Sequence, residues 1–497
     1  MPSIIPAKDE FFEKAKLGNL IPVYREIIAD METPVSAFKK LGDASFAFLL
    51  ESVEGGENIG RFSFLGANPQ IIFRSKAHDG EIIFSNGRRE TFHDAAPLGR
   101  LRDLLSRFKF VADPELPPFC GGAVGYMSYD EVKNIETIGS RPADDRNLPD
   151  LYFMLTDTLL IFDHVRHRLK ILANAHVDGF TPPEAAYEEA VRKIDALHER
   201  LRQPLSAAQP SSSSPTPPPL SIDSNFTKDA FEAVVEKCKE YIMAGDIFQV
   251  VPSQRFHVTI SCDAFEIYRA LRVVNPSPYM YYLKFDDLRI AGSSPEILVK
   301  VSDGIVQIRP IAGTRRRGQT RQEDAELEVE LLADPKERAE HIMLVDLGRN
   351  DCGRVCKYGT VRVDDLMAIE RYSHVMHIVS NVVGELREGL DAFDVLRAAF
   401  PAGTVSGAPK IRAMQIIDEI EPVCRGPYAG TVGYFSFNGS LDSCITIRTV
   451  VMQGNEAYIQ AGGGIVADSV PAAEYQETVN KATGMLRAIE MAECGMD

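Results

Sequence analysis

Four glutamates occur in two segments whose composition is typical of helices. Glu337 and Glu340 are three residues apart in DPKERAEHIMLVDLGRND, and Glu474 and Glu477 have the same spacing in SVPAAEYQETVNKATGMLRAIE, followed by Lys481. On an α-helix this spacing puts the side chains on one face. A solvated helix face is one explanation. The other is a Mg²⁺ site, because Mg²⁺ prefers oxygen ligands, keeps several waters and binds anionic substrate oxygens.

Two glycine-containing segments are candidates for anion binding. Gly462, Gly463 and Gly464 in AGGGIVADS follow a strand-like run, and backbone N–H groups at such a turn can approach a carboxylate closely. A tight hairpin is the alternative. In FPAGTVSGAPKIRAMQII, Thr404 and Ser406 precede a helical run, which indicates an anion site at a helix N-terminus. This segment lacks the ending of a nucleotide-binding P-loop.

Three further polar residues lie in apolar or turn-like surroundings. His377 in RYSHVMHIVSNVVGEL is either a hydrogen-bonded core histidine or a titratable functional group. Arg448 in CITIRTVV lies in a β-branched, strand-like run, where an unpaired buried guanidinium is strongly unfavourable. It therefore needs an anion, supplied by the protein or by a substrate carboxylate. Glu296 in AGSSPEILV follows a turn-forming proline and is either a turn residue or a general acid.

The segments that must position these residues are mostly strand-like. Runs such as SFAFLLESV, RFHVTI, YMYYLKF, TVGYFSF and CITIRTVV are rich in β-branched and aromatic residues, and many alternate between apolar and polar residues. Apolar residues at helical spacing predict helices at 183–202 and 231–242, the second capped by Thr227 and ended by Gly245. Because helices interrupt the strands without strictly alternating with them, we expect an α+β fold with large antiparallel sheets and flanking helices.

The chain has 497 residues, and its segment QPLSAAQPSSSSPTPPP is dominated by proline and serine. Such a composition predicts an exposed linker, which we place at 203–224 between an N-terminal part, 1–202, and a C-terminal part, 225–497. With 54 Lys plus Arg against 71 Asp plus Glu, the formal charge of −17 argues against nucleic-acid binding. No apolar run is long enough to span a membrane. The first residues do not have the pattern of a secretory signal, so we expect a cytoplasmic protein.

Taken in order, ten segments resemble the chorismate-utilising enzyme family, and most closely the large (component I) subunits of anthranilate synthases. They are LLES, NPSPYMYYL, AGSSPEILV, PIAGTRRRG, ERAEHIMLVDLGRND, RYSHVMHIVS, PAGTVSGAPK, GPYAGTVGYFSF, CITIRT and AGGGIVADSVPAAEYQETVNKA. The similarity covers most of the chain. It implies the two-domain architecture of this family, in which 1–202 holds part of a tryptophan regulatory site and 225–497 binds chorismate.

The resemblance also implies ligand-binding roles. Glu340 and Glu477 are expected to hold Mg²⁺, with Glu337 and Glu474 supporting them, so that the metal neutralises the ring carboxylate of chorismate. The positions expected to bind chorismate are Gly313, Thr314, Tyr428, Arg448, Gly462, Gly463 and Gly464. A guanidinium, a cation and a row of backbone amides match the two carboxylates of this substrate.

The implied reaction is attack of ammonia on C2 of the chorismate ring with loss of the 4-hydroxyl group, followed by elimination of pyruvate to leave anthranilate. Glu296 matches the acid that protonates the departing hydroxyl, His377 the residue that assists elimination, and Thr404 a substrate contact. Lys481 is expected to pair with the acidic cluster. Gln249 in DIFQVVPSQ occupies the position where isochorismate and salicylate synthases use a lysine to activate water, a base that neutral ammonia does not need.

Two other functions remain as alternatives. Aminodeoxychorismate synthase component I has the same fold, but it often carries lysine where this chain has Ala312 in PIAGT. A tryptophan-binding regulatory module without catalysis is the second alternative. The retention of the glutamates in both acidic segments argues against it.

The resemblance further implies a partner. The chain has no glutaminase nucleophile turn of the G-x-C-x-G kind, since Cys120 in PPFCGGAVGY is preceded by Pro118 where a glycine is required. Ammonia is therefore expected from a separate glutamine amidotransferase subunit, the anthranilate synthase component II. The expected assembly is a heterotetramer of two large and two small subunits.

Feedback inhibition by L-tryptophan is the last expectation. Glu51 and Ser52 of LLES, together with Pro278, Tyr279 and Met280 of NPSPYMYY, resemble the tryptophan pocket of inhibited family members. Core strands are the alternative for either segment alone. A wall of proline and methionine with a hydroxyl and a carboxylate suits an amphipathic indole amino acid.

Overall fold

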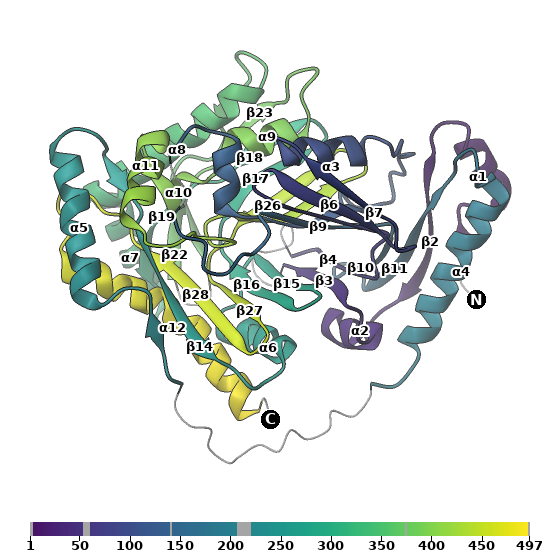
Figure 1. Ribbon diagram of the computed structural model, residues 1–497, viewed down its shortest axis with the longest axis horizontal. Helices are drawn as coiled ribbons and strands as arrows, with labels where there is room; N and C mark the ends of the chain where they lie inside the picture. The colour runs from purple at the N-terminus through teal and green to yellow at the C-terminus, as the bar shows by residue number, and fades with distance from the viewer. Residues whose placement is uncertain (1–2, 53–59, 140–141, 206–219, 373–374, 496–497) are drawn as a thin grey trace.

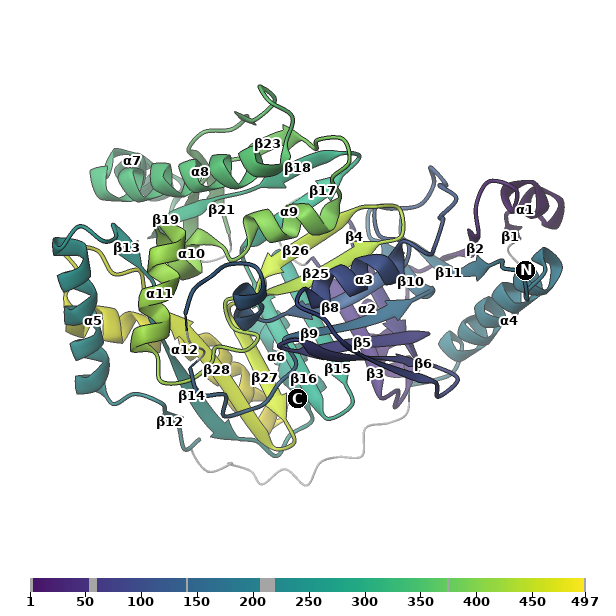
Figure 2. The same ribbon diagram turned by 45° about the horizontal axis from the view of Figure 1, so that its top comes forward.

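The computed structural model describes residues 3–52, 60–139, 142–205, 220–372 and 375–495. Two large antiparallel sheets pack face to face at its centre (Figures 1 and 2). Within the described residues, the first sheet has twelve strands and the second has eleven. Helices flank both sheets. This confirms the predicted α+β class with large antiparallel sheets.

Neighbouring strands in both sheets are antiparallel. In spatial order, the first sheet consists of β1 (Ile4–Ile5), β2 (Leu20–Ile28), β11 (Arg168–His176), β10 (Thr158–Asp163), β4 (Phe62–Ala67), β3 (Phe46–Glu51), β15 (Tyr279–Phe285), β16 (Leu288–Ser294), β27 (Thr449–Gln453), β28 (Glu456–Gly462), β14 (Ser253–Thr259) and β12 (Asp223–Ser224). The second consists of β20 (Arg362–Val363), β23 (Val382–Glu385), β18 (Ile305–Ile308), β17 (Ile297–Ser302), β26 (Leu441–Ile445), β25 (Thr431–Ser436), β8 (Gly122–Met127), β9 (Leu151–Thr156), β5 (Ile71–Lys76), β6 (Asp79–Phe84) and β7 (Arg89–His93). Two smaller sheets consist of β19 (Ile311–Arg316), β22 (Val375–Val379) and β21 (Ala368–Arg371), and of β13 (Gln249–Val250) and β24 (Gly407–Ala408).

The helices lie outside the pair of sheets. Those packed on the first sheet are α1 (Lys8–Lys14), α2 (Pro34–Leu41), α4 (Pro183–Leu201), α6 (Ala264–Val274) and α12 (Pro471–Cys494). Those packed on the second sheet, or joining its core at one end, are α3 (Pro97–Leu105), α5 (Lys228–Met243), α8 (Pro335–Val355), α9 (Ala392–Ala399) and α11 (Lys410–Ile420). Residues of η1 (Tyr129–Asn134) and α10 (Gly403–Ser406) also join this core, and α7 (Arg321–Ala333) packs against β22. Helices α1 and α4 lie at one end of the molecule, and α5, α7 and α11 at the other (Figures 1 and 2).

Alternation along the strands explains why the sheets can be covered on both faces. On β8, Val124 and Tyr126 point into the core between the sheets, whereas Ala123 and Met127 point toward the helices of the second sheet. Successive side chains of a strand point to opposite faces, so each strand contributes to two cores. The predicted alternating runs are therefore strands buried on both sides.

Both parts of the sequence contribute to both large sheets. Strand β3 pairs with β15, with Glu51 opposite Met280, and β8 pairs with β25, with Gly125 opposite Gly433. The division into 1–202 and 225–497 stays a prediction about organisation along the chain. Of the predicted 203–224 linker, 206–219 lie outside the described residues, and its last two residues form β12, which pairs with β14.

The predicted helix boundaries agree with the structure. Oγ1 of Thr227 accepts a hydrogen bond from the backbone N–H of Ala230 (3.2 Å) and caps α5. Gly245, with φ of +84°, follows the end of that helix. Within the described residues, no helix is both long and apolar enough to cross a membrane.

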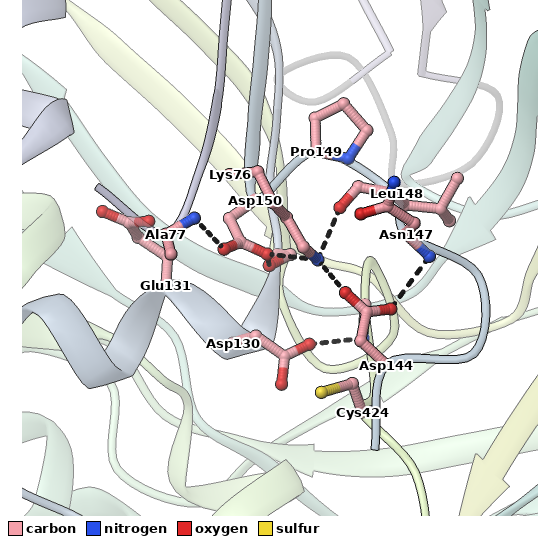
Figure 3. A network of polar contacts seen from close by, with 12 residues as sticks. Lys76, Ala77, Asp130, Glu131, Asp144, Asn147, Leu148, Pro149, Asp150 and Cys424 are labelled. Atoms are coloured by element: carbon pink, nitrogen blue, oxygen red, sulfur yellow. Dashed lines mark hydrogen bonds and ion pairs between the residues drawn. The ribbon is translucent and has the colours of Figure 1, made fainter. Parts of the chain in front are cut away.

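A partly buried polar network joins β5 to the loops that surround η1 (Figure 3). Nζ of Lys76 forms ion pairs with Asp144 and Asp150 (3.2 Å to Oδ1 of Asp150). Asp130 accepts a hydrogen bond from the backbone N–H of Gly426 (2.7 Å). The hydrogen bond from Gly426 to Asp130 anchors the segment between α11 and β25, which carries Tyr428.

Candidate active site

Helix α12 brings two of the acidic side chains to the glycine turn that follows β28. A Cβ atom on Gly463 would lie 3.2 Å from Oε2 of Glu474 and 3.9 Å from Oε1 of Glu477. Nζ of Lys481 forms an ion pair with Oε1 of Glu477 (2.6 Å) and donates to the carbonyl oxygen of Gly462 (2.9 Å). The predicted pairing of Lys481 with the acidic cluster is therefore present.

Helix α8 supplies the other two acidic side chains. Nε2 of Gln249 donates to Oε1 of Glu340 (3.1 Å) and lies 2.7 Å from the position of a Cβ atom on Gly464. Nη1 of Arg315 donates to Oε1 of Glu337 (3.3 Å). The carboxylates of α12 thus border the glycine turn directly, and Glu340 of α8 is linked to it through Gln249, although the two helices are more than a hundred residues apart in the sequence.

Like charges adjoin within each helix, although Arg315 pairs with Glu337 and Lys481 with Glu477. Burial raises the pKa of Glu337 and of Glu474, and the like charges of Glu340 and Glu477, respectively, add to this. Among the described residues, no three Asp, Glu, His or Cys side chains form a preassembled metal site. Mg²⁺ does not require one, because it takes one or two protein carboxylates and completes its shell with water and substrate oxygens. The donor set therefore fits Mg²⁺.

Arg448 lies in a break between β26 and β27. Its φ of +52° is left-handed, which a strand does not tolerate, so the single strand predicted from CITIRTVV is wrong at this residue. Nη1 donates to the carbonyl oxygen of Lys481 (2.9 Å). Burial lowers the pKa of the guanidinium, and it forms no ion pair with a carboxylate of the described residues. It is therefore available to an anionic ligand.

Glu296 and Thr404 are hydrogen-bonded although they are 108 residues apart: Oγ1 of Thr404 donates to Oε2 of Glu296 (2.9 Å). Glu296 lies between β16 and β17, and Thr404 is in α10. Burial raises the pKa of Glu296, against the opposing effects of this hydrogen bond and of the charges on Lys481 and Arg448. The protonated form is therefore favoured relative to an exposed glutamate.

His377 lies on β22 opposite Thr314 of β19. Its Nδ1 is 3.0 Å from the carbonyl oxygen of Gly313 and 3.0 Å from Oγ1 of Thr314. A carbonyl only accepts, so Nδ1 carries the proton and Nε2 is the acceptor of the neutral ring. Burial lowers the pKa of His377, which favours that neutral form. Gly313 has φ of +69°, and its Cβ atom would lie 3.1 Å from Oε2 of Glu337, so this bulge position requires glycine.

Tyr428 completes the wall behind the glycine turn. Burial raises its pKa to about 12, so it is a hydroxyl donor at neutral pH. A Cβ atom on Gly462 would lie 2.8 Å from this hydroxyl oxygen. The guanidinium of Arg425 covers the Tyr428 ring, 5.5 Å from its centroid.

A separate cavity of about 550 Å³ lies between the two sheets. It is lined by all the residues predicted to bind tryptophan, namely Glu51, Ser52, Pro278, Tyr279 and Met280. Oγ of Ser52 is buried and has no hydrogen-bond partner among the described residues. An unsatisfied buried hydroxyl at a cavity wall is favourable only if a ligand or water bonds to it.

Two carboxylates of this cavity already have partners. Glu51 accepts a hydrogen bond from the hydroxyl of Tyr268 and forms an ion pair with Nε of Arg272 (3.0 Å). Asp442, which we did not predict, accepts from the hydroxyl of Tyr279 (2.9 Å). The only sequence signal for Asp442 was a carboxylate within the strand-like run LDSCI.

The cavity shares a wall with the candidate active site. Pro295, Ile311 and Tyr372 line it. Pro295 directly precedes Glu296, and the ring of Tyr372 contacts that of His377 edge to face, with centroids 5.6 Å apart. Residues adjacent to both expected proton-transfer groups therefore line the cavity.

The structure places Arg315, Tyr372 and Arg425 next to the site, and we predicted none of them. Arg315 occurs in a run of three arginines, RRR, whose local pattern does not say which side chain turns inward. Arg425 and Tyr372 lie in loop-like segments without helical or strand periodicity. Their positions next to the site depend on packing against segments that are distant in the sequence.

Residues 46–487 match the family described as chorismate binding enzyme. Anthranilate synthase component 1 of Acetivibrio thermocellus is 52% identical to this chain over 490 residues, which cover 98% of this chain and 99% of that protein. The crystal structure of anthranilate synthase component I from Streptococcus pneumoniae TIGR4 has a TM-score of 0.78 at 39% identity, and the match covers 93% of this chain and 99% of that chain. A menaquinone-specific isochorismate synthase from Escherichia coli has a TM-score of 0.68 at 19% identity over 97% of this chain and 98% of that chain, a likeness of fold alone. The chain therefore belongs to the chorismate binding enzyme family, among the anthranilate synthase component 1 proteins.

Proposed function

We propose that this chain is the large subunit of anthranilate synthase. It adds ammonia to C2 of chorismate, releases the 4-hydroxyl as water and eliminates pyruvate to leave anthranilate. The observation that carries this proposal is the guanidinium of Arg448, which has no carboxylate partner among the described residues and lies beside Glu296 and the glycine turn. The names of the relatives described above support this choice of reaction.

Chorismate carries two carboxylates, which the site recognises by different means. Arg448 binds one of them through its planar fork of donors. Glu340 and Glu477 would hold Mg²⁺, with Glu337 and Glu474 adding negative charge, and a cation held there would neutralise the ring carboxylate. Gly313, Thr314, Tyr428 and the turn Gly462–Gly464 surround the ring.

Glu296 is the acid for the first step. Hydroxide is a poor leaving group, so the 4-hydroxyl must receive a proton as its bond to the ring breaks. Burial raises the pKa of Glu296, which keeps that proton in place, and Thr404 holds one carboxyl oxygen (2.9 Å). Because the acid form is required, activity falls as pH rises through the pKa of Glu296.

His377 assists the second step. With Nδ1–H bonded to the carbonyl of Gly313, its Nε2 accepts the proton from C2 as the ether bond to C3 breaks and pyruvate leaves. Burial lowers the pKa of His377, so the required neutral ring is lost only when pH falls through that lowered value. Gln249 binds Glu340 and supplies no base, which suits a neutral ammonia nucleophile.

Ammonia comes from glutamine through a separate amidotransferase subunit. Cys120 is not a candidate nucleophile, because it is buried and desolvation raises its pKa to about 12. The functional assembly is a heterotetramer of two large and two small subunits in the cytoplasm. Addition of purified component II should make glutamine an ammonia donor, and light scattering of the mixture should give the mass of the heterotetramer.

L-Tryptophan inhibits the enzyme by binding in the cavity between the sheets. The supporting observations are its volume of about 550 Å³, its apolar Pro278 and Met280 wall and the hydroxyl of Ser52, which has no hydrogen-bond partner in the part of the chain that the structure describes. The chain contains no tryptophan, so indole fluorescence anisotropy reports only the ligand. Anisotropy that does not rise on adding protein contradicts this part of the proposal.

The catalytic proposal is tested by incubating the protein with chorismate, ammonium and Mg²⁺, with and without L-tryptophan. The expected products are fluorescent anthranilate and pyruvate in equal amounts. Formation of 4-amino-4-deoxychorismate instead assigns the chain to the aminodeoxychorismate synthases. Tryptophan binding without turnover of chorismate assigns it a purely regulatory role.

A further inference from the structure

Arg425 is a charged side chain placed in the interior behind the glycine turn. It is only 2% exposed and forms a bidentate ion pair with Glu421, four residues earlier: Nε donates to Oε2 (2.9 Å) and Nη2 to Oε1 (2.6 Å). A buried ion pair is weak evidence for a contribution to stability, because desolvation offsets the attraction between the charges. The remaining contacts of the pair indicate another role.

The other donors of Arg425 bind two chain segments that carry expected site residues. Nη1 donates to the carbonyl oxygen of Val405 (2.7 Å), the neighbour of Thr404, and Nη2 donates to that of Val251 (2.7 Å), two residues after Gln249. These segments also bond each other, because the N–H of Val251 donates to the carbonyl of Ser406 (3.1 Å).

Glu421 and the face of the guanidinium extend these contacts to the rest of the site. Oε1 of Glu421 accepts from the backbone N–H and from Oγ of Ser253 (2.8 and 2.9 Å), and Ser253 pairs with Gly462 in the sheet. The guanidinium also lies against the ring of Tyr428. One ion pair therefore contacts the segments that present Thr404, Gln249, Tyr428 and the glycine turn.

We propose that Arg425 and Glu421 are positioning residues that hold these four segments in the geometry needed for chorismate. The role requires arginine, because its rigid fork bonds a carboxylate and two carbonyls at once and presents a flat face to an aromatic ring. A lysine ammonium is a single point charge with three donors and satisfies only part of this set. The proposal rests on the proposed reaction, but it concerns residues that do not touch the substrate.

The test is the double variant Arg425→Met/Glu421→Leu. Removal of both charges leaves no unpaired buried ion, but it takes hydrogen-bond partners from the carbonyls of Val405 and Val251 and from Ser253, so the melting temperature is expected to fall moderately while the protein stays folded. A misplacement of about 1 Å at reacting groups lowers rates about 100-fold, so kcat/KM for chorismate should fall by one to two orders of magnitude, with a higher KM. A folded double variant with unaltered kcat and KM overturns the proposal.

Arg425→Lys is the second variant, because it keeps the charge on its carboxylate partner. It should have activity between those of the double variant and the unaltered protein. The matched control is Lys193→Met, which removes an ion pair (2.7 Å) between α4 and Asp157, the residue that joins β9 to β10, at the end of the molecule remote from the site; it should leave kcat and KM unchanged. L-Tryptophan binding in the cavity serves as a separate check that each variant is folded.

Each outcome bears on the proposal. A double variant that does not fold, combined with a fully active Arg425→Lys, makes the pair a stability element and overturns the positioning role. Impaired Arg425→Lys with a nearly unchanged melting temperature supports it. If the unaltered protein does not convert chorismate and ammonium, the proposed function is overturned. The positioning role is tested separately, because its test compares the variants with an unaltered protein that is active.

Discussion

The hydrogen bond from Thr404 to Glu296 yields a prediction about the pH dependence of catalysis. The change is Thr404→Val, which keeps the shape of the side chain and removes the hydroxyl that donates to Oε2 of Glu296 (2.9 Å). This hydroxyl stabilises the carboxylate more than the carboxylic acid, so its loss should raise the pKa of Glu296 further. Since Glu296 is the expected acid, the basic limb of the pH profile should move to higher pH.

The size of the shift follows from the strengths of the two hydrogen bonds. A bond to a charged acceptor contributes about 1.5–3 kcal/mol, and one to a neutral acceptor about 0.5–1.5 kcal/mol, so the difference is about 1–1.5 kcal/mol. One pKa unit corresponds to about 1.4 kcal/mol, which predicts a shift of about one unit. The maximal kcat should also fall, because Thr404 is an expected substrate contact.

The assay is the pH dependence of kcat, followed by anthranilate fluorescence at saturating chorismate. The total ammonium concentration is adjusted at each pH so that neutral ammonia stays constant. Ser406→Ala is the matched control, because its hydroxyl lies in the same short helix but donates to the carbonyl of Ala402 (2.8 Å). A basic limb that stays in place or moves to lower pH in Thr404→Val refutes the assignment of Glu296 as the acid held by this threonine.

Glu340→Gln should weaken Mg²⁺ binding at least about tenfold, because it removes an anionic ligand. Mg²⁺ titrations that follow turnover and melting temperature measure this change. An unchanged dependence on Mg²⁺ contradicts the ligand role of Glu340. Ser52→Phe should fill part of the cavity and relieve tryptophan inhibition while the KM for chorismate stays the same; unchanged anisotropy of bound tryptophan removes Ser52 from the pocket. Lys410→Met should destabilise the fold by about 3–5 kcal/mol, because it leaves Asp351 buried without its ion pair (2.9 Å). Burial raises the pKa of Asp351 to about 6, above its value in the unfolded chain, so the protonated folded form gains stability as pH falls. The destabilisation of Lys410→Met in denaturant titrations should therefore be smaller below this pKa than above it, and a loss independent of pH argues against an unpaired charge.

The site was partly predictable because some of its features are local. Spacing of three residues places Glu337 with Glu340, and Glu474 with Glu477, on a single helix face wherever that helix packs. The ordered motifs indicated the family before any geometry was known. Their expected roles in binding Mg²⁺, chorismate and tryptophan stay predictions until the experiments above are done.

The sequence by itself predicted the helices at 183–202 and 231–242, several alternating strands and the cap at Thr227, because these depend on interactions within a few residues. Only the tertiary structure decided that Arg448 breaks its strand, that Thr404 binds Glu296, and that Arg425 lies buried among four segments. These features depend on contacts between residues far apart in the sequence. Such contacts form only where the two sheets and their helices pack, and no local periodicity encodes which distant partner a polar side chain will meet.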